Sequence, residues 1–205
     1  MYKVKYDMFN FFVNKKTKSI WNEFEGKINT DKVIIEKAKK LAKTFIAFSS
    51  GGVTSIFEEM NKSSNHNLEN KWDDVFIETI IFNMIFTKRI SEKYLKDRVR
   101  DLFNQTLLSE INNILIQAFK TTKEREACSE NFIQMYNQCE NEYSLYKITP
   151  PLKTESMSGY LLWEFGKKVS NILDCKNDSQ VIVLVNIAIT GILTSLKIPD
   201  LLNEM

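Results

Sequence analysis

The sequence predicts an all-α protein, a single globular bundle of about seven to nine helices. The 205 residues include only six glycines and three prolines, so the chain has few of the residues that end helices. Apolar residues recur at helical spacing in most segments, and the 43% hydrophobic and 26% charged content is typical of a soluble globule. The single histidine argues against most metal, triad and histidine acid–base chemistry.

Three helices are expected in the first part of the chain, at residues 3–25, 31–48 and 53–60. The first is expected to end near Gly26. The Ser-Ser-Gly-Gly run at residues 49–52 predicts either a helix break or a close helix crossing, because glycine weakens a helix and lets backbones approach. A polar loop should follow at residues 61–70, with His66 exposed and inert.

Five further helices are expected, at residues 70–90, 91–119, 121–146, 156–173 and 179–197. A capping-box pattern, Thr121 with Glu124, supports one of these starts, and the last helix is expected to begin at Asp178 or Ser179. Pro199 is expected to end that last helix. The Pro150-Pro151 pair marks a sub-boundary at 147–155 within one domain, 1–205, and the C-terminal pair of helices should pack back onto 1–146.

Two of the expected helices, 70–90 and 179–197, are apolar nearly all round. We therefore predict that both are buried central helices. Residues 181–196 carry no charge, but a membrane span needs about 20 predominantly apolar residues, and this stretch includes Asn186 and three hydroxyl residues. We expect a core helix here and no membrane span.

The charge and the cysteine content limit where the protein can be located and which kinds of partner it can bind. The net charge of +2 alternates along the chain, at +6 over residues 1–48, −4 over 49–86, +4 over 87–125 and −4 over 126–205. A dedicated nucleic-acid binder would be far more basic. The three cysteines, Cys128, Cys139 and Cys175, show no CxxC pair and are expected to be reduced core or boundary residues. We expect a cytoplasmic protein that needs no cofactor.

The best surface candidate is a stripe of four basic residues. Arg89, Lys93, Lys96 and Arg100 fall at i, i+4, i+7 and i+11 on one helical face. Such a stripe could bind an acidic partner or phosphates. Acidic residues are interleaved with it, so a solvated face that pairs with itself is the simpler alternative.

A second candidate is an aromatic groove beside Pro150-Pro151. Tyr143, Tyr146, Tyr160 and Trp163 flank this break and could line a groove, although aromatic residues at helical spacing more often belong to a core.

Acidic residues near the start of the helix at 70–90 allow an enzymatic alternative. Asp74 and Glu78 are four residues apart, so their carboxylates, together with Asp73, could hold Mg²⁺ and a diphosphate. Acids in the first turn are also favoured by the helix dipole without any metal. We assign no metal site and no catalytic residue, and we keep a Mg²⁺ site at these residues as an alternative hypothesis.

These observations favour a non-enzymatic helical protein–protein interaction module, such as a cytosolic adaptor, a regulator or a toxin-neutralising, immunity-type partner. Its charge patches would orient a protein complex. The alternative is a helical protein that binds a small apolar molecule, with or without Mg²⁺-dependent catalysis through Asp74 and Glu78. A weak nucleic-acid contact through the basic stripe ranks third, because no helix-turn-helix is evident.

Overall fold

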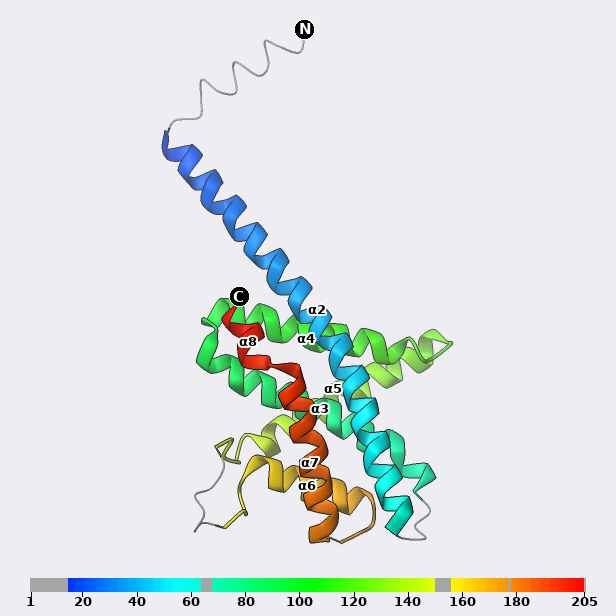
Figure 1. Ribbon diagram of the computed structural model, residues 1–205. Coiled ribbons are helices and arrows are strands. Elements are labelled where there is room, and N and C mark those ends of the chain that lie inside the picture. The colour runs from blue at the N-terminus through cyan, green and yellow to red at the C-terminus, as the bar shows by residue number, and fades with distance from the viewer. Residues whose placement is uncertain (1–14, 64–67, 150–155, 177, 205) are drawn as a thin grey trace.

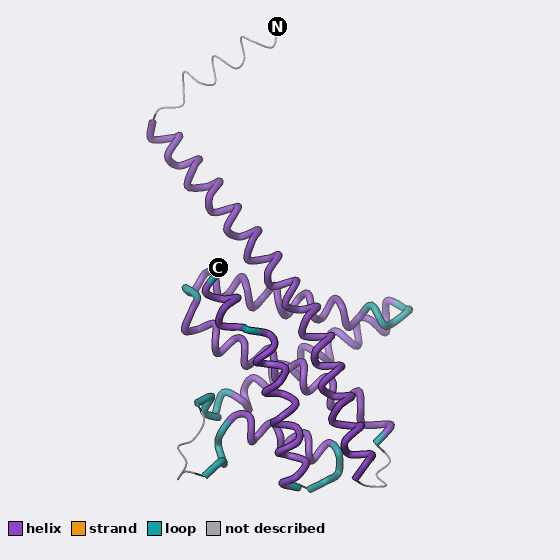
Figure 2. Tube along the Cα trace, viewed as in Figure 1, coloured by secondary structure: helices purple, strands orange, loops and turns teal. Residues whose placement is uncertain are grey.

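The computed structural model describes residues 15–63, 68–149, 156–176 and 178–204, and the side chains of residues 15–29, 63 and 69 lie outside the description. His66, Pro150-Pro151 and residues 3–14 of the first expected helix are also outside it. The described elements are helices joined by short connections (Figures 1 and 2), in the order α2 (Lys15–Ser63), the 3₁₀ turn η1 (Glu69–Lys71), α3 (Trp72–Tyr94), α4 (Asp97–Ile116), α5 (Thr122–Tyr143), α6 (Leu161–Ile172), α7 (Ser179–Leu196) and α8 (Ile198–Asn203).

The all-α class is therefore confirmed for the described residues, where no strand occurs. The expected number of seven to nine helices is not confirmed. One reason is that α2 is a single helix of 49 residues, in which the sequence predicted separate helices. Its first turns extend well beyond the other helices (Figure 1).

The breaks predicted near Gly26 and at residues 49–52 are wrong, since both lie inside α2. The alternative prediction for residues 49–52 was a close helix crossing, and Gly52 forms one. A Cβ atom on Gly52 would lie 2.6 Å from Cδ1 of Ile192 in α7. Ser49 is also buried there, and its hydroxyl accepts a hydrogen bond of 3.1 Å from the side-chain amide of Asn83. Tertiary packing thus offsets the weak helix propensity of this segment.

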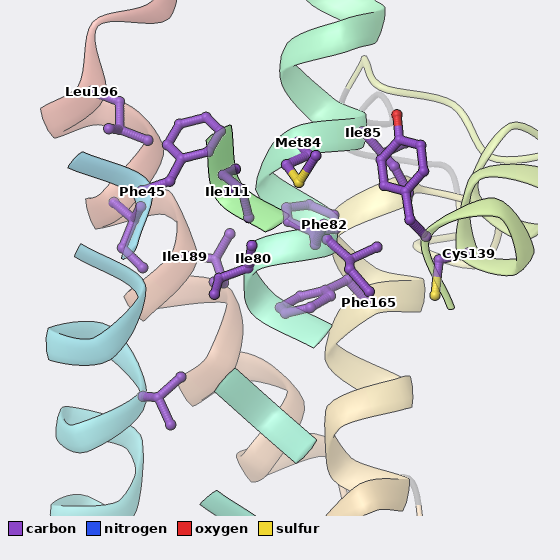
Figure 3. Packing of buried hydrophobic residues seen from close by; sticks show 14 of the residues in the cluster. Phe45, Ile80, Phe82, Met84, Ile85, Ile111, Cys139, Phe165, Ile189 and Leu196 are labelled. Atoms are coloured by element: carbon purple, nitrogen blue, oxygen red, sulfur yellow. The ribbon is translucent and has the colours of Figure 1, made fainter. Parts of the chain in front are cut away.

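The helix α3 lies at the centre of the bundle, in contact with α2, α4, α5, α6 and α8. All eight residues from Glu78 to Ile85 are buried, which leaves no face of these two turns for solvent. Figure 3 shows apolar side chains from α3 packed between the neighbouring helices. The ring of Phe82 lies 4.2 Å, centroid to centroid, from that of Phe165 in α6.

The helix α7 is not central, so the predicted pair of buried helices is not confirmed. It packs mainly against α2 and α6 and buries a single face, formed by Ile182, Val185, Ile189, Ile192 and Leu196. The opposite side is open to solvent, with Val183 48% exposed and Ile187 66% exposed. An uncharged composition predicts apolar surroundings, but it does not say on how many sides they lie.

The boundary between α3 and α4 also differs from the prediction. We expected one helix to begin at Ser91 and to reach residue 119, yet α3 continues to Tyr94 and α4 runs from Asp97 to Ile116. Leu95 is extended, with φ −113° and ψ 140°, and its side chain is buried. The chain therefore turns at an apolar residue inserted into the core.

Two predicted helix starts are confirmed in atomic detail. Thr121 Oγ1 accepts a hydrogen bond from the backbone N–H of Glu124, and the Glu124 carboxylate accepts one from the N–H of Thr121, which completes the capping box. Asp178 caps α7 by accepting a hydrogen bond of 2.7 Å from the N–H of Gln180. At the other end, α7 stops at the left-handed Lys197 (φ 45°), and Pro199 lies in the first turn of α8.

A glycine also sets the distance between α6 and α7. A Cβ atom on Gly166 would lie 2.9 Å from Cγ2 of Ile182 and 3.1 Å from its carbonyl oxygen. Because a backbone oxygen cannot move aside like the end of a side chain, Gly166 is the tighter of the two crossings of α7. Gly51 and Gly191, in contrast, have no atom within 4 Å of such a Cβ.

These glycines give a matched test of the packing of α7. Gly166→Ala should lower the free energy of unfolding by about 1–2 kcal/mol, because overpacking at a helix crossing exceeds the roughly 1 kcal/mol that alanine adds to helix propensity. Gly51→Ala and Gly191→Ala meet open space and should raise it by up to about 1 kcal/mol. Urea denaturation of the three variants measures this. Equal stability of Gly166→Ala and Gly191→Ala would contradict the close crossing.

Candidate functional site

A cluster of ionisable side chains, buried at its centre and open to solvent at one edge, joins α3, α5 and α6. Its centre is Glu78, which is 3% exposed and accepts a hydrogen bond from the hydroxyl of Tyr143. The ammonium group of Lys168 lies 3.2 Å from the Glu78 carboxylate and 3.0 Å from that of Glu142. It also lies over the ring of Tyr143, 5.1 Å from the centroid. Each of the three helices thus contributes at least one member.

The thiol of Cys139 also belongs to this group. We call the group the ionic cluster and define it as Glu78, Cys139, Glu142, Tyr143 and Lys168. Its Sγ lies 3.2 Å from Nζ of Lys168 and 3.7 Å from the nearer carboxylate oxygen of Glu78. Burial and the charge of Glu78 raise the pKa of the Cys139 thiol to about 11. Because the thiolate is the nucleophile, this cysteine is unreactive near neutral pH.

The other two partners of Glu78 also keep their protons. Burial and the adjacent Glu78 carboxylate raise the pKa of the Tyr143 hydroxyl well above its usual value. Burial opposes the charge of Lys168, but the carboxylates of Glu78 and Glu142 outweigh it and raise the pKa of this ammonium group. The ionic cluster therefore holds a fixed set of charges that ties three helices together.

This arrangement separates the acidic residues that were considered for Mg²⁺. Asp73 and Asp74 lie exposed in the first turn of α3, whereas Glu78 points into the bundle. The Glu78 carboxylate is already occupied by Tyr143 and Lys168. Among the residues that the structure describes, no group of three or more His, Cys, Asp or Glu side chains could hold a metal ion.

The four predicted basic residues do not form one helical stripe. Arg89 and Lys93 belong to α3, Lys96 is the N-cap of α4, and Arg100 lies one turn into α4. The extended Leu95 between the two helices changes their register.

Two of these basic side chains are engaged within the protein. Arg89 donates a hydrogen bond of 2.9 Å to the carbonyl oxygen of Tyr143. Arg100 pairs with Asp97 at 3.1 Å and with Asp101 at 3.5 Å. Lys93 and Lys96 are exposed. The self-paired alternative therefore accounts for Arg100.

The aromatic residues beside the proline pair are also divided. Tyr143 is fully buried in the ionic cluster, while Tyr146, Tyr160 and Trp163 are half-buried. The N–H of Lys147 donates to the carbonyl oxygen of Gly159 at 2.9 Å, and the Lys147 carbonyl accepts from Leu161. These bonds hold the segments of Tyr146 and Tyr160 side by side. Tyr143 is thus a core residue and does not line a surface groove.

The open side of α7 is the surface that sequence reasoning missed. We name it the α7 face and define it by its exposed residues, Ser179, Gln180, Val183, Ile187, Thr190, Gly191, Thr194 and Ser195. A shallow depression of about 390 Å³ lies on it, lined by Ser179, Gln180, Val183, Leu184 and Ile187. Polar and small residues at one side of the second half of α7, namely Thr190, Gly191, Thr194 and Ser195, were the available signal that this side meets water.

The same region passes a compositional test for a membrane span. The segment Ser179–Asn203 is long and apolar enough to cross a bilayer, and 33% of its most apolar window is buried in the bundle. The core helix of a soluble protein also passes this test, so the result is weak evidence.

A second shallow depression, of about 540 Å³, lies on α5. Its lining is rich in uncharged amides, with Gln134, Asn137, Gln138 and Asn141 among its residues. No group of ionisable side chains converges on it.

Comparisons with protein-family models, curated protein sequences and solved structures found no significant match to this chain. The function is therefore inferred from the geometry of the described residues.

The ionic cluster predicts a strong asymmetry between single and double variants. Lys168→Met should lower the free energy of unfolding by about 2 kcal/mol, because it leaves the buried Glu78 carboxylate without its cation; a fully buried pair would lose roughly 3–5 kcal/mol. Adding Glu78→Gln should recover most of this loss. Lys71→Met, which breaks the exposed pair with Asp174, is the control and should change stability by less than about 1 kcal/mol.

Urea denaturation of the four proteins measures these differences. Equal effects of Lys168→Met and Lys71→Met would show that the ionic cluster contributes nothing beyond a surface pair.

The raised thiol pKa predicts a loss of stability at alkaline pH. The folded Cys139 holds its proton up to about pH 11, whereas the unfolded thiol releases it near 9.0, so unfolding is favoured as the pH rises through this window. Between pH 9 and 11 the wild type should lose about 2 kcal/mol more than Cys139→Ala. Unfolding free energies at four pH values check this, and parallel curves for the two proteins would contradict it.

Proposed function

We propose that this protein is a non-enzymatic helical interaction module, of the adaptor or regulator kind, that binds a protein partner on the α7 face. The observation that carries the proposal is the exposure of Ile187 and Val183 on a helix without a single charged residue. Exposed apolar side chains that lie together on an otherwise charged surface are typical of protein contact sites.

The shape of the α7 face supports docking of a helix or another flat element. The depression beside Ile187 is shallow, and it is lined by side chains from one helix. A small-molecule site would instead be concave and would bury most of its ligand. The hydroxyl and amide groups of Gln180, Thr190 and Thr194 supply the polar contacts that surround the apolar centre of an interface.

The ionic cluster supports a non-enzymatic role. Its cysteine, lysine and tyrosine are the side chains that could act as nucleophiles or general bases, yet burial and mutual pairing hold all three in their protonated forms. They stabilise the α3–α5–α6 junction on which the rest of the bundle is built.

The test is site-specific photo-cross-linking in the native cells. A photoreactive residue at position 187 should capture a defined protein, whereas the same residue at position 145 should not. Leu145 is the matched control, because it is an apolar residue that is 80% exposed and lies outside α7, just after α5. The captured protein is then purified and bound to this chain in solution.

Ile187→Lys should weaken that purified complex about five- to thirtyfold, because burial of the exposed part of an isoleucine contributes about 1–2 kcal/mol. Leu145→Lys should leave the affinity within about twofold. Identical capture at positions 187 and 145, or a purified complex that tolerates Ile187→Lys, would contradict the proposed function.

A further inference from the structure

We infer that water bound inside the protein joins α2, α3 and α4, bridging the hydroxyl of Thr87 to the side-chain amides of Asn83 and Asn104. This internal water does not depend on what the α7 face binds, so it goes beyond the proposed function. A row of buried polar side chains on α3 indicates it, because three oxygen atoms on or beside that row have no hydrogen-bond partner among the described residues.

The polar row consists of Asn83, Thr87 and Ser91, which are all fully buried. They are four residues apart, so they lie on one face of α3 and follow each other at about 6 Å along its axis. At one end, the side-chain amide of Asn83 donates a hydrogen bond of 3.1 Å to the hydroxyl of Ser49 in α2. At the other end, the side-chain amide of Asn104 in α4 donates one of 3.3 Å to the hydroxyl of Ser91. The polar row therefore faces α2 and α4, which also pack against each other.

Three oxygen atoms along this interface are shielded from solvent and form no hydrogen bond within the part of the chain that the structure describes. They are the amide oxygens of Asn83 and Asn104 and the hydroxyl oxygen of Thr87. An unpaired polar group in the interior is costly, so nearly all such groups in proteins bind another protein group or ordered water. The three atoms therefore mark a site for a small polar ligand.

Rotation of the side chains in the polar row does not pair all three atoms. The Thr87 hydroxyl has one proton, so it donates to at most one of the two amide oxygens. The Ser91 hydroxyl already donates its proton to the carbonyl oxygen of Lys88, at 2.6 Å. A ligand that supplies further protons is therefore needed.

Water fits these atoms better than a metal ion does. The unpaired oxygens are neutral, two from amides and one from a hydroxyl. A divalent cation takes about six oxygen ligands, usually with carboxylates among them. Internal water typically makes about three hydrogen bonds, and it can donate two of them. A water molecule beside Thr87 thus accepts from the hydroxyl and donates to the amide oxygens.

This water completes a connection between three helices. Hydrogen bonds then run from Ser49 in α2 through the polar row to Asn104 in α4. Because hydrogen bonds are directional, the connection favours one register of α2, α3 and α4, as the ionic cluster does for α3, α5 and α6.

Water-selective NMR on the full, isotope-labelled chain tests the site. Cross-peaks from long-lived water should appear at Thr87 and at the side-chain amides of Asn83 and Asn104. Thr79 is the matched control, because it is also fully buried in α3 but donates its hydroxyl proton to the carbonyl oxygen of Val75, at 2.7 Å. The methyl group of Thr79 should show no such cross-peak, which excludes transfer through exchange of a hydroxyl proton.

Magnetic relaxation dispersion of the solvent oxygen nuclei gives a second measurement, since it counts long-lived waters and does not detect hydroxyl protons. Thr87→Val keeps the shape of the side chain and removes the hydroxyl, so it should lower the count by at least one. Thr87→Ser, which keeps the hydroxyl, and Thr79→Val should leave the count unchanged. The cross-peaks of the wild type decide the matter even where Thr87→Val fails to fold.

A wild type without long-lived water at Thr87, or a folded Thr87→Val variant with the wild-type count, would overturn the inference. The melting temperature should stay the same when choline chloride replaces sodium chloride at equal ionic strength. A lower melting temperature in choline chloride would show that a monovalent cation occupies the site, and the assignment of water would be wrong.

Discussion

The burial of α3 on every side is the constraint on which the rest of the structure depends. From Glu78 to Ile85 each residue is enclosed, so the other helices must surround this one. Burial also takes polar groups into the interior, where each unpaired group is costly. The side-chain N–H of Asn83 donates a hydrogen bond to Ser49 in α2. The Glu78 carboxylate accepts one from Tyr143 in α5 and forms an ion pair with Lys168 in α6. These directional contacts are specific to one register, which apolar packing alone would not define as sharply.

The central position of α3 determines where α7 can lie. With α3 enclosed, α7 packs at the edge against α2 and α6, held close by Gly52 and Gly166. An 18-residue helix without charge then keeps one side in water. The α7 face is thus a consequence of how the bundle is completed, and a protein contact there would bury the apolar surface that the bundle leaves open.

The all-α class and the local helix starts could be predicted from the sequence, because helix periodicity and capping depend on neighbouring residues. Thr121 and Glu124 form the capping box that their spacing indicates, and α7 begins at Ser179 as expected. The continuity of α2 through Gly52 could not be predicted, because it depends on a contact with Ile192 from the far end of the chain. The ionic cluster could not be predicted for the same reason. Glu78 was placed with Asp74 by spacing, whereas its partners lie 65 and 90 positions further along.

Hydrogen–deuterium exchange on the intact protein, read at single-amide resolution, tests the central position of α3 most directly. Amides of a fully enclosed helix exchange only when the whole bundle opens, whereas those of an edge helix also exchange through local opening. The structure predicts that residues 78–87 exchange last, with one common rate, and that residues 183–194 of α7 exchange measurably sooner. Faster exchange in residues 78–87 than in α7 would contradict the account.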